Sequence, residues 1–333
     1  MASPALAARI EALLQRHWWR PAPTLLMQAL RPLAALVSGL AALTRQSPLR
    51  APVPVVVVGN LIVGGAGKTP TVIALVQALA AAGWHPGVIS RGYGRRDGGA
   101  REVAARDPAA DIGDEPLLIR RRTEVPVWVG RDRVAAACAL CAAHPEVDVI
   151  VSDDGLQHYR LRRDIELAVI DAATGLGNGW PLPAGPLREP RSRLSSVDAV
   201  IQVVRGAAQP ESTGAATWRA DYTAGPAWRL CAPLEKQALR DLPSRDWLAV
   251  TGIGRPQGFF DMLQAEGVRF SPRAFADHHA FQPQELPADA AVLMTEKDAV
   301  KCLAFAGTDW WAVELDVAPE TGFIDWLSAR TKR

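Results

Sequence analysis

A glycine-rich loop after an apolar run contains the residue types that bind phosphate in many proteins. The run Val55–Val58 leads through this loop to Lys68 and Thr69. Glycines allow backbone N–H groups to turn towards phosphate oxygens, and the N-terminus of a following helix adds partial positive charge. In such loops the lysine reaches the outer phosphates and the threonine hydroxyl binds Mg²⁺. The residues predicted to bind a nucleotide are Asn60, Gly64, Gly65, Ala66, Gly67, Lys68, Thr69 and Pro70.

The loop departs from the strict spacing G-x-x-x-x-G-K-[ST], which would place glycine where this chain has Ile62. Gly64 and Gly65 supply the turn instead. The chain contains 32 arginines and only five lysines, and Lys68 is the only lysine in the first 235 residues. A chain that otherwise prefers arginine is expected to keep a lysine where a compact ammonium is needed. We therefore favour a phosphate site over a glycine-rich turn that binds no ligand.

Two adjacent carboxylates, Asp153 and Asp154, follow a second apolar run, Val147–Ser152. In a parallel sheet the carboxyl ends of the strands face the ligand crevice. An acid there can hold Mg²⁺ beside a triphosphate, and its neighbour can orient the metal shell. An ordinary turn is the alternative for these two acids. His158 follows four residues later and could line the same pocket, although a single histidine is more often structural.

Two further segments combine acidic residues with a place in a loop. Asp114 and Glu115 precede a predicted helix, where an acid can act as N-cap and complement the helix dipole. They could equally supply a general base for a hydroxyl nucleophile, and spacing does not choose between these roles. Asp277 and His278 lie in the second half of the chain. A contact between such a pair across a cleft could orient a base or tune its pKa.

Arginines stand at two positions where a ligand is expected. Arg131 and Arg133 directly follow the predicted strand Pro126–Val129, and Arg188 with Glu189 ends a proline-rich loop. Each arginine could stabilise charge on a transferring phosphoryl group or hold an anionic substrate. The alternative for each is a solvated surface residue.

Alternating apolar strands and helices must position these side chains. Strands are predicted at Pro54–Val58, Gly87–Ser90, Pro126–Val129, Val147–Ser152, Glu166–Ile170 and Val197–Val204, and helices at Thr71–Ala82 and Asp132–Ala143. A second pattern has strands at Trp247–Val250, Ala290–Met294 and Trp311–Leu315, and a helix at Phe259–Glu266. Such alternation indicates an α/β fold with a parallel sheet covered on both faces. The polar stretch Arg205–Thr217 is a plausible connector between two units.

The first 50 residues differ in charge from the rest of the chain. They contain six arginines and one acid, Arg9, Arg16, Arg20, Arg31, Arg45, Arg50 and Glu11, for a net charge of +5. The segment also holds Trp18, Trp19 and the apolar stretch Pro32–Thr44. These features suit amphipathic helices lying on an anionic membrane surface. The alternative is a pair of helices packed on the main domain.

Composition excludes several classes of protein. A chain of 333 residues is long enough for about two domains. Apolar residues make up 49% and charged residues 22%, so the chain is not disordered. A formal charge of +2 provides no global attraction for nucleic acid, and no apolar stretch reaches membrane-spanning length. No secretory signal is visible, so the cytoplasm is the expected compartment. Cys138 and Cys141 have the spacing of half a zinc site, but without a second pair we expect buried thiols.

Several segments together with the phosphate loop resemble the tetraacyldisaccharide 4′-kinase family, the lipid A 4′-kinases. The matching segments run in the family's order over residues 53–301, most of the chain. They are Gly59-Asn60, Gly64–Pro70, Ser90–Arg95, Gly113–Pro116, Asp153–His158, Leu182–Pro190, Asp277-His278 and Thr295–Asp298.

The resemblance implies ATP- and Mg²⁺-dependent phosphorylation of the 4′-hydroxyl of tetraacyldisaccharide 1-phosphate, which forms lipid IVA. It implies a P-loop NTPase-like α/β/α sandwich (51–205), a second, smaller α/β/α domain (206–333) and an active site in the cleft between them. With the basic helical segment (1–50), we expect a peripheral protein on the cytoplasmic face of the bacterial inner membrane. Its expected partners are the lipid disaccharide and an anionic membrane surface, with no nucleic acid and no obligate protein partner.

The resemblance also implies roles for individual residues. Lys68 would hold the outer phosphates, and Asp114 would be the base with His278 as its partner. Thr69, Glu115 and Asp154 would serve the metal shell, with Asp153 beside it. The remaining residues implied to line the site are Arg131, His158, Arg188, Glu189 and Asp277.

Some positions depart from the family pattern or bear on other functions. Ile62 and Ala66 stand where the family has hydroxyl residues, so backbone N–H groups would carry the phosphate contacts. A membrane-recruited regulatory ATPase with a deviant phosphate loop is the main alternative, but Val63 occupies its signature lysine position. A GTP-dependent switch is a further alternative. Its base-reading motif Asn/Thr-Lys-x-Asp is absent, because Lys297 and Asp298 are adjacent.

Overall fold

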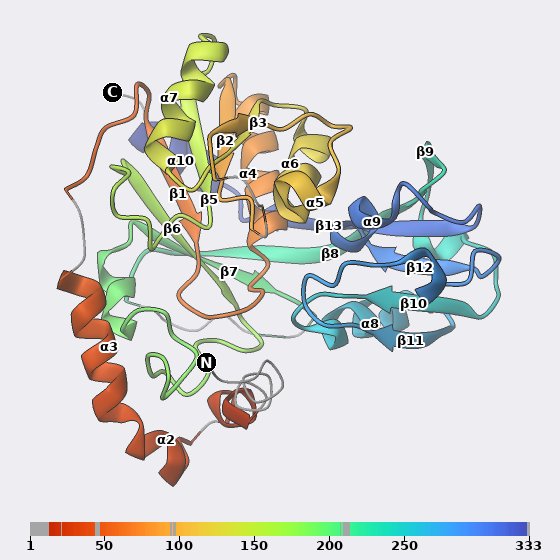
Figure 1. Ribbon diagram of the computed structural model, residues 1–333, viewed down its shortest axis with the longest axis horizontal. Coiled ribbons are helices and arrows are strands. Elements are labelled where there is room, and N and C mark those ends of the chain that lie inside the picture. The colour runs from red at the N-terminus through yellow and green to blue at the C-terminus, as the bar shows by residue number, and fades with distance from the viewer. Residues whose placement is uncertain are drawn as a thin grey trace.

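A computed structural model describes residues 13–20, 22–43, 47–93, 95, 98–206, 208 and 214–331. One mixed sheet of 13 strands runs through this part of the chain, and helices cover both of its faces (Figure 1). The predicted α/β architecture is therefore confirmed. Several residues used in the sequence analysis lie outside the described residues: Arg9, Glu11, Arg45 and Gly94.

The larger unit contains the phosphate loop at the centre of its sheet. Its strands are β1 (Val55–Gly59), β2 (Pro86–Ser90), β3 (Arg101–Glu102), β4 (Val127–Val129), β5 (Val149–Asp153), β6 (Ile165–Asp171) and β7 (Ala199–Val204). Its helices are α4 (Lys68–Ala81), α5 (Ala109–Ile112), α6 (Asp114–Thr123), α7 (Arg133–Ala143), α10 (Phe323–Thr331) and the 3₁₀ turn η1 (Arg191–Ser196). Strands β7, β6, β1, β5, β2 and β4 are neighbours in that order and all parallel.

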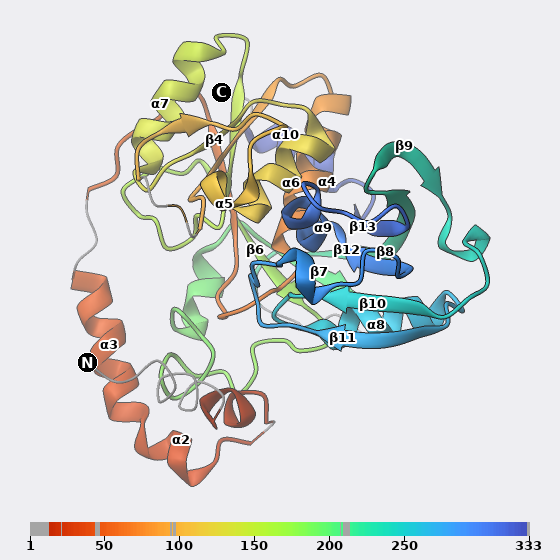
Figure 2. The same ribbon diagram turned by 45° about the vertical axis from the view of Figure 1, so that its right-hand side comes forward.

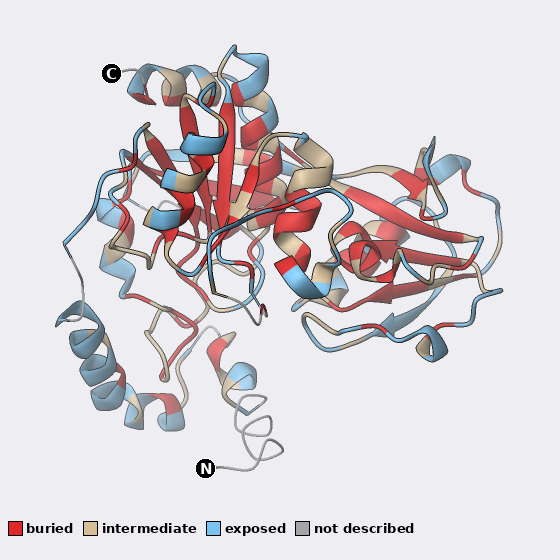
Figure 3. Cartoon of the chain, turned by 45° about the horizontal axis from the view of Figure 1, so that its top comes forward, coloured by how far each residue is buried: buried red, intermediate tan, exposed pale blue. Residues whose placement is uncertain are grey.

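The valine run forms β1 because alternate side chains of a strand point to opposite faces, and here both faces are covered. Val56 and Val58 pack in the cluster that holds α4, α6 and α10. Val55 and Val57 pack in the cluster that holds α7. The central strand is therefore buried throughout (Figure 3).

Helix α4 begins at Lys68, three residues before the predicted start at Thr71. The difference arises at Pro70, because a proline in a sequence usually indicates that a helix is interrupted there. In the first turn of a helix its missing N–H has no partner to lose, so it is tolerated there. Lys68 and Thr69 therefore belong to the first turn of α4 rather than to the preceding loop.

The smaller unit contains the second predicted pattern. Its strands are β8 (Thr217–Arg229), β9 (Ala232–Gln237), β10 (Trp247–Thr251), β11 (Phe270–Ala274), β12 (Val292–Thr295) and β13 (Trp310–Pro319). Its helices are α8 (Pro256–Ala265) and α9 (Glu296–Cys302), with 3₁₀ turns η2 (Leu239–Asp241) and η3 (Pro283–Glu285). Helices α8 and α9 pack in different apolar clusters, one on each side of this part of the sheet.

Two long strands join the units. The start of β8, Thr217–Asp221, pairs with β7 in parallel, and Ala220–Arg229 pairs with β13 in antiparallel. After β13 the chain returns to the larger unit, where Phe323 and Leu327 of α10 enter the same core cluster as β1. The sheet is thus continuous across the predicted connector, and the division at residues 205 and 206 stays a prediction.

The N-terminal helices α2 (Leu25–Ala29) and α3 (Arg31–Leu43) lie beside the larger unit with most of their surface uncovered (Figures 1 and 2). Exposed apolar side chains on them are Leu25, Leu26, Leu33, Leu36, Val37, Leu40 and Leu43. Only Ala34 of α3 is buried. Among the described residues, none of the helices combines the length and apolar character that crossing a membrane requires.

The two tryptophans before these helices contact the protein, and the membrane contact expected for the N-terminal segment stays a prediction. Trp18 is 5% exposed, and its indole N–H donates to the carbonyl of Pro183 at 3.0 Å. The guanidinium of Arg255 lies over the ring of Trp19, 4.3 Å from its centroid, within the distance at which a cation is attracted to an aromatic face. A buried indole N–H usually has a hydrogen-bond partner, and the contacts of Trp18 and Trp19 hold this part of the N-terminal segment against the protein.

Candidate active site

A cavity of about 340 Å³ lies between the two units, at the carboxyl ends of β1 and β5. Its walls from the larger unit include the phosphate loop and the first turns of α4 and α6. Those from the smaller unit include the loop after β10 and the start of α9. The predicted site residues that line it are Gly64, Gly65, Ala66, Gly67, Lys68, Thr69, Pro70, Glu115, Asp154, Arg188, Asp277 and His278. Residues remote in sequence are thus gathered at one crevice.

The phosphate loop presents its backbone to this cavity. Gly64 and Gly67 have φ of +90° and +80°, the left-handed region that side chains disfavour. Nothing lies within 4 Å of the position that a side chain at Gly64 would occupy. Asn60 fixes the loop, because its amide donates to the carbonyl of Gly64 and its oxygen accepts from Lys68 Nζ, both at 3.2 Å. The space beside the backbone at Gly64 and the ammonium group of Lys68, which Asn60 holds, make this loop suitable for binding polyphosphate.

Ile62 faces away from the cavity, which explains the departure from the strict spacing. It is 2% exposed and forms a β-bridge with Leu187 of the proline-rich loop. The backbone N–H of Val63 also donates to the carbonyl of Pro186, at 2.9 Å. The proline-rich loop therefore supports the phosphate loop from outside, and a hydroxyl at position 62 is not needed for that contact.

Asp154 joins the phosphate loop to Arg188. Its carboxylate lies 3.5 Å from Lys68 Nζ and 3.1 Å from Arg188 Nη1. Burial acts to raise the pKa of Asp154, but Lys68 and Arg188 outweigh it, and the net pKa is lowered. Its φ of +48° is unusual for a residue with a side chain. Such strain is kept mainly where the surrounding structure and a function require it.

Asp153 is buried beside these groups with part of its carboxylate unpaired. Oδ2 accepts from the hydroxyl of Ser90 at 3.0 Å, whereas Oδ1 has no partner. Burial, followed by repulsion from Glu115 and Asp154, raises the pKa of Asp153 to about 7. A cation between these carboxylates would remove the repulsion. The donor set therefore fits a divalent cation.

The carboxylates do not form a complete metal cage by themselves. Within the described part of the chain, no group of three or more histidine, cysteine or acidic side chains has the geometry to hold a metal ion. Mg²⁺ in kinases is commonly held by one or two carboxylates together with substrate phosphates and water. An incomplete protein shell that includes Thr69 is consistent with that mode of binding.

Asp114 and His278 meet across the cleft between the units. His278 Nδ1 lies 3.0 Å from Asp114 Oδ2. Burial acts to raise the pKa of Asp114, but the hydrogen bond with His278 and the charges of Lys297 and Lys301 lower it to about 2. The hydrogen bond to Asp114 raises the pKa of His278, and burial opposes it. The N-cap of α6 is Gly113, so the N-cap role considered for Asp114 is wrong.

His278 is held in an unusual conformation at the edge of the cavity. Its φ is +57°, and its backbone N–H donates to Asp277 Oδ1 at 3.0 Å. The ring of Tyr93 packs on it with the centroids 5.0 Å apart. Among the described residues with side chains, positive φ occurs at Asp154, His278 and Glu124. Two of these three line the cavity, which is where strain of this kind concentrates.

Two lysines of the smaller unit were not predicted as site residues. Lys297 Nζ lies 2.9 Å from Glu115 and 3.5 Å from His278 Nε2. Lys301 Nζ lies 4.0 Å from Asp114 and 2.8 Å from Asp298. The scarcity of lysine that drew attention to Lys68 could have identified both. Three of the five lysines in the chain lie at this site.

Some predicted site residues lie outside the cavity. The side chain of Arg131 is exposed and packs along Gly98, and Arg133 is buried behind Asp153 with Nη1 donating to the carbonyl of Gly130. His158 is half-buried, and burial together with nearby arginines lowers its pKa to about 4. Glu189 is buried and accepts hydrogen bonds from Gln157 and Tyr159. The roles implied for these residues stay predictions.

Glu189 nevertheless supports a residue that lines the cavity. Gln157 donates to Glu189 at 2.9 Å, and its own oxygen lies 3.3 Å from Arg188 Nη1. The same Arg188 nitrogen reaches Asp154. Glu189 therefore fixes the wall that holds Arg188, and its effect on the site is indirect.

The arrangement can bind a polyphosphate and accept a proton beside it. Open loop amides, Lys68 and Arg188 suit phosphate oxygens, and the carboxylates suit a cation. His278 lies on the opposite wall, where a hydroxyl group could approach, and the buried carboxylate of Asp114 contacts it there. These parts are those that phosphoryl transfer needs, because that reaction depends mainly on positioning and charge stabilisation.

Comparison with known proteins agrees with this geometry. The family model described as tetraacyldisaccharide-1-P 4′-kinase (LpxK) matches residues 26–332. A tetraacyldisaccharide 4′-kinase of Thiobacillus denitrificans is 65% identical over 279 residues, which cover 84% of this chain and 85% of that protein. One of Azoarcus sp. strain BH72 is 50% identical over 316 residues, covering 92% and 91%.

A solved structure is also similar over nearly the whole fold. The crystal structure of LpxK from Aquifex aeolicus in complex with ATP has a TM-score of 0.77 and 25% sequence identity. The match covers 92% of this chain and 100% of that chain. The arrangement of two units about a cleft is thus shared with a protein that binds ATP.

Proposed function

The chain belongs to the tetraacyldisaccharide 4′-kinase family, and from this we propose how its cleft carries out the transfer. The family match makes it an ATP-binding kinase of lipid A biosynthesis, which phosphorylates the 4′-hydroxyl of tetraacyldisaccharide 1-phosphate and forms lipid IVA. The contact between Asp114 and His278 across the cleft is the observation that carries the mechanism. Asp114 from one unit would be the base, and His278 from the other unit would be its partner.

The phosphate loop is the proposed binding site for the ATP phosphates. The amides of Gly64–Gly67 would surround the phosphate oxygens, and Lys68 would reach the outer ones. Arg188 is directed into the cavity by Asp154 and Gln157, so it can stabilise charge on the phosphoryl group as it transfers. Asn60 would contribute to phosphate binding indirectly, because it holds Lys68 and the loop in position.

Thr69, Glu115, Asp154 and Asp153 are the residues that would hold Mg²⁺. When bound, this ion would neutralise negative charge on the phosphates. Glu115 is now paired with Lys297 at 2.9 Å, so Lys297 and a cation compete for its carboxylate. The unpaired Oδ1 of Asp153 is the best support for a cation at this place.

Asp114 is the proposed base for the 4′-hydroxyl, with His278 holding it in position. A carboxylate whose pKa is about 2 is always ionised at working pH, but it attracts protons weakly. Phosphoryl transfer through a loose transition state needs no early deprotonation of the hydroxyl. The attacking oxygen becomes strongly acidic only as its bond to phosphorus forms. A positioned carboxylate with a low pKa can then accept the proton.

The exposed face of α3 is the proposed membrane contact. Leu33, Leu36, Val37, Leu40 and Leu43 follow helical spacing and share one side of the helix. Such an apolar stripe, which the other described residues leave exposed, suits the interface of a bilayer, and the arginines of the segment suit anionic lipid. An enzyme whose substrate carries acyl chains must reach that surface, which we place on the cytoplasmic face of the inner membrane.

The most direct test of this function incubates the protein with ATP, Mg²⁺ and purified tetraacyldisaccharide 1-phosphate. We expect the lipid to gain the mass of one phosphoryl group, with the new phosphate on the 4′-oxygen. Lys68→Ala should abolish the gain, because the outer phosphates lose their cation. Unchanged lipid with the intact protein, or full activity of Lys68→Ala, would contradict the proposal.

A further inference from the structure

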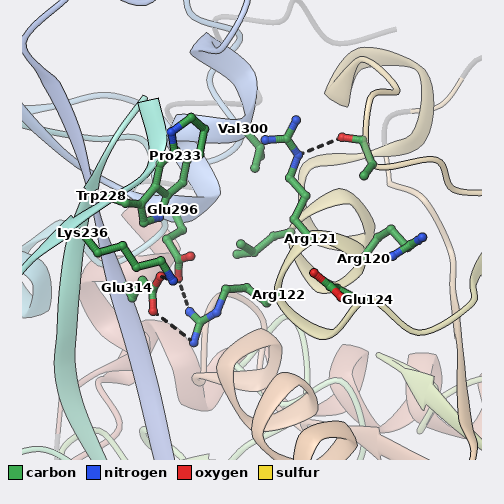
Figure 4. Close-up of a pocket in the computed structure, with 12 residues that line it drawn as sticks. Arg120, Arg121, Arg122, Glu124, Trp228, Pro233, Lys236, Glu296, Val300 and Glu314 are labelled. Atoms are coloured by element: carbon green, nitrogen blue, oxygen red, sulfur yellow. Dashed lines mark hydrogen bonds and ion pairs between the residues drawn. The ribbon is translucent and has the colours of Figure 1, made fainter. Parts of the chain in front are cut away.

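A second cluster of charges, with Arg122, Glu296 and Glu314 largely buried, joins the two units near the C-terminus of α6. Arg122 Nη1 lies 2.5 Å from Glu296, and its Nη2 lies 2.6 Å from Asp316 and 3.7 Å from Glu314. Lys236 reaches Glu314 from the other side at 2.7 Å (Figure 4). Arg122, Lys236, Glu296 and Glu314 form part of the wall of a cavity of about 550 Å³, and Glu296 lines the active-site cavity as well.

The cluster crosses the boundary between the units. Arg122 belongs to α6 of the larger unit, whereas Glu296, Glu314 and Asp316 belong to α9 and β13 of the smaller one. The Arg122 and Glu296 side chains are 13% and 4% exposed. Glu296 also accepts from the backbone N–H of Leu315 at 3.3 Å. The pair therefore holds α6, α9 and β13 at one point.

Helix α6 is held by the smaller unit at both ends. At its N-terminus, Asp114 contacts His278 and Glu115 contacts Lys297. Near its C-terminus, Arg122 contacts Glu296, the residue that precedes Lys297. Two consecutive residues of α9, Glu296 and Lys297, thus contact α6 near its two ends. The two helices lie side by side in Figures 1 and 2. A shift of α6 at Arg122 would move the carboxylates at its other end.

Buried ion pairs seldom add stability beyond what packed apolar side chains would supply, because both charges lose their hydration. They do restrict how two elements can slide, since an unpaired buried charge is costly. The planar guanidinium of Arg122 contacts two carboxylates from different elements in a fixed geometry, whereas a lysine ammonium is a point charge on a flexible stem. The cluster is therefore suited to fixing the position of α6.

We propose that Arg122 is a positioning residue that holds α6 in register with the smaller unit, so that Asp114 and Glu115 face His278 and Lys297. The expected effect on catalysis rests on the proposed role of Asp114, whereas the expected effect on the position of α6 does not. Arg122 lies at the opposite end of α6 from the substrates and acts through the helix.

The test compares Arg122→Met and Arg122→Lys with Arg120→Met, a matched change at a neighbouring arginine of α6 whose side chain has no ion-pair partner among the described residues. Two quantities are measured: steady-state kinetics, and the titration of His278 by NMR, assigned by its loss in His278→Gln. We expect Arg122→Met to lower kcat about tenfold or more, with the KM for ATP within about twofold. The pKa of His278 should fall, because its contact with Asp114 loosens. Arg122→Lys should be intermediate, and Arg120→Met should match the unmodified protein.

Arg122→Met leaves buried carboxylates unpaired and could unfold the protein. The double variant Arg122→Met/Glu296→Gln removes both charges of the pair and keeps the test valid, with folding checked by circular dichroism. It should show the same fall in kcat and in the pKa of His278. An unchanged His278 titration in folded Arg122 variants would overturn the proposal, whatever happens to kcat. A lowered pKa with unchanged kcat would instead support the positioning and contradict the role of Asp114.

Discussion

At the scale of single residues, the site depends on charges that face one another from the two units. Asp114, Glu115 and Asp154 supply the carboxylates, and Lys68 and Lys297 supply two of the cations that pair with them. Each carboxylate is at least partly buried, so each is costly unless a cation stands opposite. Bound substrate phosphates and a metal ion would therefore change the ion pairs that the ammonium groups of Lys68 and Lys297 form with these carboxylates. This makes the site electrostatically responsive to ligands.

The pairing of His278 with Asp114 makes stability depend on pH in a defined direction. The pKa of His278 is raised from 6.5 in the folded protein, because Asp114 accepts its hydrogen bond. The charged imidazole therefore stabilises the fold fully below pH 6.5, and this contribution is lost as pH rises through the raised pKa. His278→Gln should lower the free energy of unfolding more at about pH 5.5 than at about pH 8.5.

Urea denaturation at the two pH values measures this difference. The same substitution in an Asp114→Asn background serves as the control, because the partner that raises the pKa is then absent. There the greater loss at acid pH should disappear, because burial and the charge of Lys297, which lower the pKa of His278, are no longer outweighed. A larger loss of stability at the alkaline pH, or an equal loss at both, would contradict the assignment of this contact.

At the scale of elements, strand β1, the phosphate loop and helix α4 act as one unit. Gly67 has φ of +80° at the N-terminus of α4, and Gly83 has φ of +89° just beyond its C-terminus. A side chain at either position strains the backbone by ~1 kcal/mol. Only Gly67 borders the cavity, and a Cβ there would lie 3.4 Å from Val203.

Gly67→Ala and Gly83→Ala should therefore separate stability from nucleotide binding. Both should lower the free energy of unfolding by ~1 kcal/mol. Gly67→Ala alone should weaken ATP binding roughly tenfold, equal to ~1.4 kcal/mol of lost interaction, because the phosphate-binding amides are displaced. Isothermal titration with ATP measures this. Equal ATP affinity of the two variants would show that the loop conformation does not matter.

The exposed face of α3 makes a prediction at the same scale. Leu36→Glu and Leu40→Glu place charges on the apolar stripe, whereas Ala35→Glu places one on an exposed position outside it. Binding to vesicles that contain anionic lipid should fall strongly for the two leucine variants, because their buried apolar area is lost. Co-sedimentation measures the bound fraction. Equal binding of all three variants would remove α3 as the membrane contact.

Sequence predicted those elements whose signals are local. The valine run forms β1, and a glycine-rich loop followed by Lys68 and Thr69 forms the phosphate loop and the start of α4. Strand β8 was missed because Thr217–Arg229 contains alanine, glycine and proline in place of a clear apolar alternation. Its partners β7 and β13, rather than its own composition, make it a strand.

Contacts across the cleft could not be predicted from sequence spacing. Lys297 and Glu115 are 182 residues apart, and Arg122 and Glu296 are 174 apart. No local pattern relates such residues, because only the folded sheet brings α6 and α9 together. The family resemblance named Asp114 and His278, whereas Arg122 became visible only through the fold. The shortage of lysine was a signal for Lys297 and Lys301 that was applied only to Lys68.

At the scale of the whole molecule, the two units divide the work. The larger unit supplies the phosphate loop, Asp154 and Asp114, and the smaller one supplies His278 and Lys297. The shared strands β8 and β13 join them beside the cavity. Movement of one unit against the other would change the Asp114–His278 contact directly. Enclosure of the substrates between the units would also exclude water from the transferring phosphoryl group.

Rapid-quench single-turnover kinetics of Asp114→Asn, with Mg²⁺, ATP and the lipid disaccharide all saturating, tests the central claim most directly. The account predicts that the rate of phosphoryl transfer falls by a factor of about 10² or more, while the Kd for ATP stays within about twofold. An unchanged transfer rate in this variant, or a loss explained entirely by weaker ATP binding, would contradict it.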